Sequence, residues 1–149
     1  MFHQLTLALG SNLGDRAVYL LRARSLVEAN LGPVTYASEV IETPAWGVTD
    51  QPDFLNQVLV VDISEWSAAP LPHPAAPASA PPIAAMLHRL LDACQAIEKE
   101  LDRVRKSDWG PRTVDLDLIF VDEVRWEDAR LSLPHPWWEE RAFVRELLP

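Results

Sequence analysis

At 149 residues, the chain is long enough to bury a substantial core, and we expect one domain over residues 1–149. Its net charge of −9 argues against a nucleic-acid-binding protein, which normally carries a basic face. No apolar run reaches the roughly 18 residues of a membrane span. Residues 1–4 lack the basic start of a signal peptide, so we expect a cytoplasmic protein without membrane contact.

The first predicted elements are a strand and a helix. Residues 5–9 have strand character and end in the turn-rich segment 10–14. Asp15 is a plausible N-cap for a helix that reaches about Asn30 and is stopped by residues 31–33. The apolar residues expected along the buried side of that helix are Ala17, Leu20, Leu21 and Val27.

Two more strands are predicted over residues 34–42 and from about 55 to 63, separated by a loop at 43–52. Residues 66–82 then contain six prolines and six alanines, a composition that favours extended, solvated chain. We interpret this segment as an inserted loop that Trp66 could anchor.

The clearest helix follows the loop, because its apolar residues recur at steps of three and four. They are Ile83, Met86, Leu87, Leu90, Leu91, Cys94, Ile97 and Leu101. Cys94 lies on this stripe, so we expect a buried thiol rather than a nucleophile. A strand at 114–120 completes the order strand, helix, strand, strand, helix, strand. This order predicts an α+β, ferredoxin-like βαββαβ fold, an antiparallel sheet with both helices packed on one face.

Two aspartates on that last strand indicate a possible metal site. Asp115 and Asp117 share one face of the strand, roughly 7 Å apart at their Cα atoms. Paired carboxylates suit Mg²⁺ that is also bound to a substrate phosphate, and Arg112 precedes them as a phosphate-binding group. Aspartates that alternate along a half-exposed strand often only face water, so both interpretations stand on these residues alone.

Other motifs are weaker. Gly10 and Gly14 fit neither a P-loop nor a dinucleotide-binding motif, and zinc signatures are absent. His135, between two prolines, is better placed for function than His73 or His88.

Several segments in order resemble the hydroxymethyl-dihydropterin pyrophosphokinases of folate biosynthesis. They are Leu-Ala-Leu-Gly-Ser-Asn-Leu-Gly-Asp near the start, Glu-Thr-Pro at 42–44, Asp-Gln-Pro-Asp-Phe-Leu-Asn at 50–56, Arg-Val-Arg-Lys at 103–106, Trp-Gly-Pro-Arg-Thr-Val-Asp-Leu-Asp at 109–117, Leu-Pro-His at 133–135 and Arg-Ala-Phe at 141–143. The run from glycine-proline-arginine to the two aspartates is the most specific of them.

The resemblance implies transfer of pyrophosphate from ATP to 6-hydroxymethyl-7,8-dihydropterin, with release of AMP. Two Mg²⁺ ions would be held by Asp115 and Asp117, and Arg103 and Arg112 would join these aspartates as catalytic residues. The ATP-binding residues it implies are Gln95, Glu98, Arg103, Trp109, Arg112, Arg130, Ser132, His135 and Arg141. The pterin-binding residues it implies are Thr43, Trp46, Phe54, Asn56 and Phe143.

The chain departs from the family pattern in the inserted loop at 66–82 and in an apparently shortened C-terminus. We expect a monomer whose partners are small molecules, and loops at 46–47 and 103–109 that close over ATP to exclude water. Two alternatives are a different Mg²⁺-dependent phosphotransferase or phosphohydrolase and a non-catalytic binding domain of the same fold.

Overall fold

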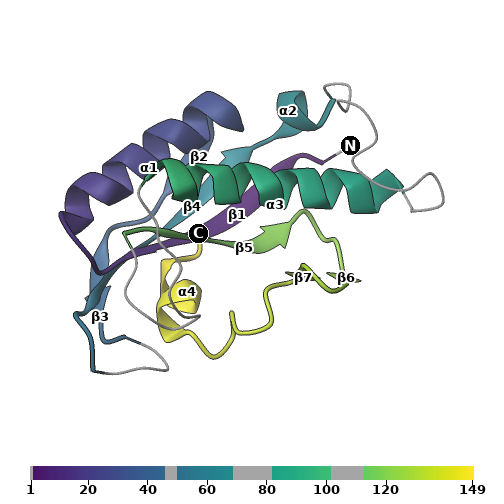
Figure 1. The fold of residues 1–149 in the computed structure, drawn as a ribbon. Coiled ribbons are helices and arrows are strands. Elements are labelled where there is room, and N and C mark those ends of the chain that lie inside the picture. Colours follow the sequence, from purple (N-terminus) through teal and green to yellow (C-terminus); the bar gives the residue numbers. More distant parts are fainter. Residues whose placement is uncertain (1, 46–49, 69–81, 102–112) are drawn as a thin grey trace.

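The structure, a computed structural model, describes residues 2–45, 50–68, 82–101 and 113–149 (Figure 1). The predicted α+β class with an antiparallel sheet is confirmed. The elements in chain order are β1 (Gln4–Ser11), α1 (Arg16–Asn30), β2 (Val34–Ala37), β3 (Ile41–Thr43), β4 (Phe54–Asp62), α2 (Ser64–Ala68), α3 (Pro82–Glu100), β5 (Asp115–Val121), β6 (Trp126–Glu127), β7 (Ser132–Leu133) and α4 (Ala142–Leu147).

The main sheet has the strand order β2-β4-β1-β5, and β3 also pairs with β4. All of its pairs are antiparallel. β1 lies inside the sheet, where Gly10 is opposite Asn56 of β4 on one side and opposite Asp115 of β5 on the other. This register brings an amide and a carboxylate from distant parts of the chain to the same end of β1.

Helices cover both faces of the sheet. Side chains alternate along β1, so its apolar residues reach the helices on each face. Leu7 and Leu9 belong to the large core cluster beneath α1 and α3, which lie across one face in Figure 1. Ala8 points the other way and packs with Ile119 and with Val144 of α4. The expectation that two helices share one face is therefore met by α1 and α3, whereas α4 was not predicted.

The N-terminal helix begins as expected but buries a different stripe. The Asp15 carboxylate accepts a hydrogen bond from the Val18 amide over 3.2 Å, which caps α1. Its buried residues are Leu20, Ala23 and Val27. The predicted Ala17 and Leu21 are exposed, and Leu21 is 67% exposed. Spacing by three and four residues fitted two neighbouring stripes, and contact with the sheet selected the one that contains Ala23.

The predicted strand at 34–42 is interrupted and forms β2 and β3 as separate strands. Ser38 lies between them and forms hydrogen bonds to β4 through its hydroxyl and its carbonyl oxygen. Its hydroxyl accepts from the Val58 amide over 2.8 Å, and its carbonyl accepts from the Gln57 side chain over 2.9 Å. The side chain thus replaces part of the regular ladder, and β3 turns toward the end of β4.

The loop predicted at about 66–82 overlaps two helices at its ends. Trp66 to Ala68 complete α2, and Pro82 begins α3, where a missing amide hydrogen costs nothing. Residues 69–81 lie outside the described part of the chain. The half-buried Trp66 packs against the core, and the Arg89 guanidinium carbon lies 4.5 Å from its ring centroid.

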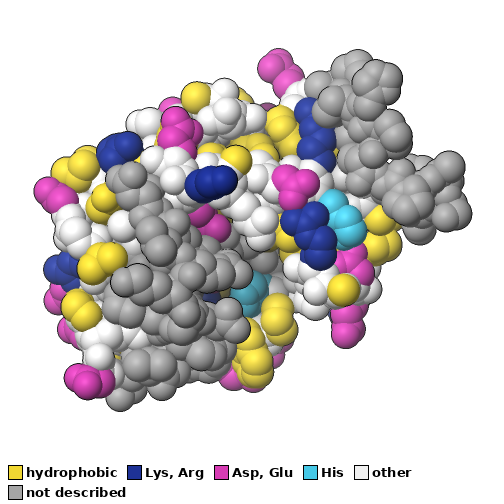
Figure 2. Space-filling view, in the orientation of Figure 1, with side chains coloured by type: hydrophobic (Ala, Val, Ile, Leu, Met, Phe, Trp, Pro, Cys, Tyr) yellow, Lys and Arg dark blue, Asp and Glu magenta, His cyan; other side chains and the backbone are white. Residues whose placement is uncertain are grey.

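The hairpin of β6 and β7, also not predicted, is tied to α3 through Asp128. This carboxylate lies 2.6 Å from His88 Nε2 and accepts a hydrogen bond from Trp126 Nε1 over 2.7 Å. On the face drawn in Figure 2, the described basic side chains lie singly or in small groups near acidic ones. Within the described ranges, no helix is both long and apolar enough to cross a membrane.

Candidate functional site

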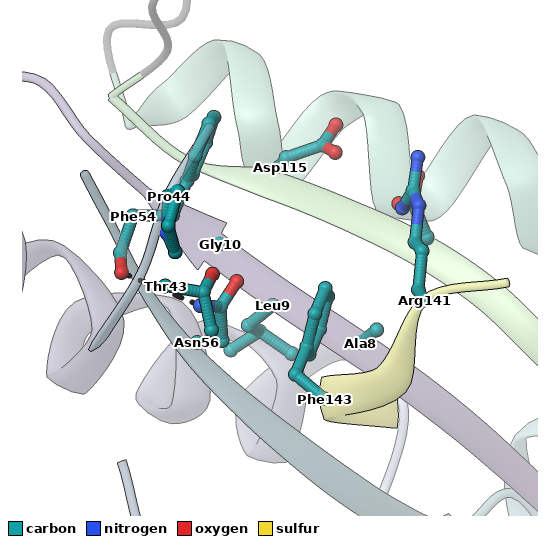
Figure 3. Close-up of a pocket in the computed structure, with 11 residues that line it drawn as sticks. Ala8, Leu9, Gly10, Thr43, Pro44, Phe54, Asn56, Asp115, Arg141 and Phe143 are labelled. Carbon is teal, nitrogen blue, oxygen red and sulfur yellow. Dashed lines mark hydrogen bonds and ion pairs between the residues drawn. The ribbon is translucent and has the colours of Figure 1, made fainter. Parts of the chain in front are cut away.

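A pocket opens on the face of the sheet that carries α4. Its floor is β1 from Ala8 to Gly10, and its walls come from β3, β4, β5 and α4 (Figure 3). The residues that line it are Ala8, Leu9, Gly10, Thr43, Pro44, Phe54, Asn56, Asp115, Asp117, Arg141 and Phe143. We call it the aromatic pocket, because its two largest wall residues are phenylalanines.

Phe54 and Phe143 stand on opposite sides of the floor formed by Leu9 and Gly10 (Figure 3). Gly10 lets the Phe54 ring lie close to β1, since a Cβ atom at Gly10 would approach Phe54 Cδ1 to 3.2 Å. Leu9 directs its side chain into the core on the other face, so the floor between the rings is low and they can enclose a flat heterocycle, with offset or edge-on ring contacts.

A fixed amide forms the polar wall of this pocket. Asn56 is 2% exposed, and its Nδ2 donates to Thr43 Oγ1 over 2.6 Å. Longer contacts join the same nitrogen to the carbonyl oxygens of Ile41 and Phe54, at 3.4 and 3.3 Å. None of these bonds uses Asn56 Oδ1, which is an acceptor held in a defined direction.

The carboxylates of β5 form the third side of the pocket. Asp115 and Asp117 share the face of β5 that also carries Ile119, as the alternation predicted. Arg141, at the start of α4, donates from Nη1 to Asp117 Oδ2 over 2.7 Å. Burial and the neighbouring Asp115 carboxylate raise the pKa of Asp117, whereas the Arg141 guanidinium acts in the opposite direction.

A second, more polar cavity lies beyond the outer edge of β5, between α3 and the β6–β7 hairpin. Its lining is Leu91, Gln95, Glu98, Asp115, Leu116, Asp117, Leu118, Asp128, Ala129, Arg130, Leu131, Ser132, His135 and Pro136. We call it the edge cavity. Asp115 and Asp117 line both cavities, so the two carboxylates stand where an apolar compartment meets a polar one.

Two walls of the edge cavity are held by charged hydrogen bonds. The Glu98 carboxylate is 5% exposed and accepts from the Leu116 amide over 2.8 Å, which pairs one amide of the edge strand β5. On the opposite wall, Arg130 pairs with Asp92 of α3 over 2.6 Å, and Asp128 accepts from the amides of Arg130 and Leu131. α3 and the hairpin are therefore fixed on either side of the cavity.

His135 is held as a neutral imidazole at the end of this cavity. Burial lowers its pKa to about 4, and the Arg141 charge acts in the same direction, opposed by Asp115. The Trp137 amide donates to its Nδ1 over 3.1 Å. In the neutral ring this contact places the proton on Nε2, so that Nε2 is a hydrogen-bond donor.

A sequence model of the 7,8-dihydro-6-hydroxymethylpterin-pyrophosphokinase family matches residues 6–76 and 80–149. The chain belongs to this family. A relative from Methylorubrum extorquens is 38% identical over 139 residues, which are 93% of this chain and 75% of the relative. One from Bacillus subtilis is 38% identical over 139 residues, covering 93% of this chain and 71% of the relative. Both carry the name 2-amino-4-hydroxy-6-hydroxymethyldihydropteridine pyrophosphokinase, as does an Aquifex aeolicus relative with 34% identity over 137 residues, which are 92% of this chain and 72% of that relative.

The residues implied by the family resemblance separate into two groups in the structure. Those expected to bind pterin line the aromatic pocket, namely Thr43, Phe54, Asn56 and Phe143. Those expected to bind ATP line the edge cavity, namely Gln95, Glu98, Arg130, Ser132 and His135, whereas Arg141 lines the aromatic pocket. Trp46, Arg103, Trp109 and Arg112 lie outside the described residues.

Sequence reasoning missed several residues of the site. Gly10 and Ala8 had a signal, because small residues alternate with Leu7 and Leu9 along β1, which indicates a floor open on one face. Asp128 had none, since its partner His88 lies 40 residues away in the chain.

Proposed function

We propose that this chain transfers the pyrophosphoryl group of ATP to 6-hydroxymethyl-7,8-dihydropterin, which gives AMP and the pterin diphosphate in folate biosynthesis. The observation that carries the proposal is the position of Asp115 and Asp117, which line both the aromatic pocket and the edge cavity. A reaction between a flat heterocycle and a nucleotide needs two such compartments that share one charged wall. Membership of the pyrophosphokinase family supports the same reaction.

The aromatic pocket suits the pterin. Phe54 and Phe143 would enclose its ring system, and such contacts contribute about 0.5–1.5 kcal/mol beyond the area that they bury. Asn56 and Thr43 would recognise its polar edge through hydrogen bonds. Trp46, outside the described residues, is a further residue that we expect to bind the pterin. A pocket that leaves these buried polar groups unpaired rejects the wrong ring, which stacking alone does not achieve.

The edge cavity suits ATP. Gln95, Glu98, Arg130, Ser132 and His135 would bind the nucleotide, together with Trp109. Arg141 would serve the phosphates, as would Arg103 and Arg112 from the segment outside the described residues. Neutral His135 would donate a hydrogen bond from Nε2 without adding a charge.

The donor set of Asp115 and Asp117 fits magnesium. Both are hard oxygen ligands on one face of β5, and Mg²⁺ prefers one or two carboxylates together with water and phosphate oxygens. We assign two Mg²⁺ ions to this carboxylate pair. Bound metal would stabilise negative charge on the attacking and leaving oxygens. The protein's own contribution is to hold both substrates in line and to exclude water, which the predicted closure of loops 46–47 and 103–109 would complete.

The strand order supports a finer assignment of the fold. With β2 and β3 counted as one interrupted strand, the order β2-β4-β1-β5 follows the ferredoxin-like plan. In this plan the two central strands are β1 and β4, which provide Gly10, Phe54 and Asn56 at the same end of the sheet.

Incubation of the protein with ATP, Mg²⁺ and the reduced hydroxymethyl-pterin, followed by nucleotide analysis, tests the proposal. Pterin-dependent AMP supports it, ADP indicates an ordinary kinase, and unchanged ATP indicates a binding domain. The double variant Asp115→Asn with Asp117→Asn should lose activity by at least about 10³-fold, the scale for losing groups that stabilise the transition state. Glu123→Gln, an exposed change just after β5, is the matched control. Activity that survives the double change contradicts the metal assignment.

A further inference from the structure

An arginine outside both cavities connects two walls of the aromatic pocket. Arg16, the first residue of α1, places Nη1 2.6 Å from Glu42 Oε2 and 2.9 Å from the Asp53 carbonyl oxygen. Each of these acceptors directly precedes a pocket residue, because Thr43 follows Glu42 and Phe54 follows Asp53. The same nitrogen thus joins the Glu42 carboxylate to the backbone at Asp53, and these two residues are the neighbours of Thr43 and Phe54.

We infer that Arg16 is a positioning residue that holds Thr43 and Phe54 in place for the pterin. Thr43 and Phe54 are opposite each other at the last pair of the β3–β4 ladder, beyond which that pairing no longer holds the two strands together. Strand ends separate readily unless another contact joins them. The Asn56–Thr43 hydrogen bond is one such contact, and the Arg16 guanidinium adds a second one with a charged group. Charged hydrogen bonds are stronger than neutral ones.

The start of α1, which carries Arg16, is held firmly in place. Asp15 caps α1, and Leu20 and Val27 of the same helix are buried in the core. Nearby, the Asn12 side chain is 2% exposed and donates from Nδ2 to Gln51 Oε1 and to the Pro52 carbonyl, each over 2.9 Å. Asn12, which precedes α1, and Arg16, at its start, therefore together contact the chain that leads into β4 at three consecutive residues, 51–53.

The alternative is that Arg16 and Glu42 form an ordinary surface ion pair. Their side chains are 31% and 51% exposed, and pairs of this kind contribute little to stability. The two interpretations differ in what they predict for substrate binding. A surface pair predicts no effect on substrate binding, whereas a positioning residue predicts weaker pterin binding with little change in the free energy of unfolding.

The test rests on the proposed function and uses Arg16→Met, which keeps most of the side-chain stem but removes both hydrogen bonds. We expect the KM for the hydroxymethyl-pterin, and its Kd measured by fluorescence without ATP, to rise about tenfold, the change equivalent to about 1.4 kcal/mol. The KM for ATP and kcat at saturating pterin should change less than twofold. Arg16→Lys should restore part of the pterin affinity.

Arg24→Met is the matched control, because Arg24 forms an exposed ion pair with Glu28 on the same helix. It should leave every constant unchanged. Unchanged pterin affinity in Arg16→Met, or an equal loss of pterin and ATP affinity, would overturn the inference while the proposed function stands. A wild-type protein that forms no pterin-dependent AMP would overturn both. If Arg16→Met fails to fold, Arg16→Lys is compared with wild type instead. A loss of pterin affinity without a similar loss of ATP affinity then supports the inference, and unchanged pterin affinity or an equal loss of both overturns it.

Discussion

Arg141 Nη1 lies 2.7 Å from Asp117 Oδ2, in an ion pair whose side chains are only 11% and 22% exposed. Asp115, on the same face of β5, is a second carboxylate that raises the pKa of Asp117, and it lines the same pocket as Arg141. A cation of the protein thus lies beside one of the two carboxylates that we assign to Mg²⁺. Removal of this cation should change both stability and metal binding.

We predict that Arg141→Met lowers the free energy of unfolding at neutral pH by about 1–3 kcal/mol, because the largely buried carboxylate of Asp117 then loses its counter-charge and must take up a proton or repel Asp115. Added Mg²⁺ should raise the melting temperature of the variant more than that of the wild type, since metal would replace the missing charge. Thermal unfolding with and without Mg²⁺ measures both effects. Arg145→Met, exposed on the same helix, is the control. Equal stabilisation of the two proteins by Mg²⁺ would contradict the assignment.

Much of the site could be predicted because its residues lie in local patterns. The alternation of Asp115 and Asp117 with Leu116 and Leu118 placed the carboxylates on one face of β5 without any knowledge of the fold. The family resemblance supplied the aromatic and amide residues, and the structure places Phe54 and Asn56 in one pocket.

The features that were missed depend on contacts between distant parts of the chain. The Arg141–Asp117 pair spans 24 residues, and α4 is a six-residue helix without a side-chain cap bond, so sequence signals were weak. Apolar spacing also misplaced Leu21, because only contact with the sheet decides which side of α1 is buried. Local periodicity identifies elements, whereas tertiary contacts determine their final orientation.

The close approach of Phe54 to Gly10 gives a prediction for pocket shape. A Cβ in Gly10→Ala would lie 3.2 Å from Phe54 Cδ1, so the ring must shift by a few tenths of an ångström. We expect the Kd for the hydroxymethyl-pterin to rise about threefold to tenfold, a cost of about 1 kcal/mol, which is the scale of overpacking in a tight site. Titration of pterin fluorescence measures this change. The Kd for ATP serves as the internal control, and a loss of ATP affinity of the same size would indicate general damage instead.

Gly32 carries a stability prediction that is independent of the site. Its φ is +148°, and a Cβ at this position would meet the Asp62 carbonyl oxygen at 2.0 Å. Backbone atoms cannot yield as a flexible side chain does, so Gly32→Ala should lower the free energy of unfolding by more than about 2 kcal/mol. Urea unfolding measures the loss. Ala29→Gly, exposed near the end of α1, is a control that should cost about 1 kcal/mol or less. Wild-type stability in Gly32→Ala would show that this contact with β4 is not tight.

The Asp128 carboxylate should make stability depend on acid pH. The hydrogen bond from Trp126 is the largest cause that lowers its pKa, and burial, the second largest, acts in the opposite direction. Hydrogen bonds from His88 and from the amides of Arg130 and Leu131 lower the pKa further, so that it lies well below the usual value. The native state therefore keeps this group ionised at a pH where the unfolded chain protonates it. Its contribution is fully present above the ordinary Asp pKa of about 3.9 and is lost as the pH falls toward the lowered native value.

We accordingly predict that Asp128→Asn lowers the free energy of unfolding by about 1 kcal/mol between pH 5 and pH 7, the scale of a lost charged hydrogen bond. The difference from wild type should shrink as the pH falls below about 4, because the unfolded wild-type chain then takes up a proton at Asp128 while the native carboxylate stays ionised, which favours unfolding. Urea unfolding of both proteins across this pH range provides the measurement. Glu127→Gln, its exposed neighbour on β6, should show no such convergence. A difference that stays constant down to the lowest pH at which both proteins fold would contradict the role of the Asp128 charge in joining the hairpin to α3.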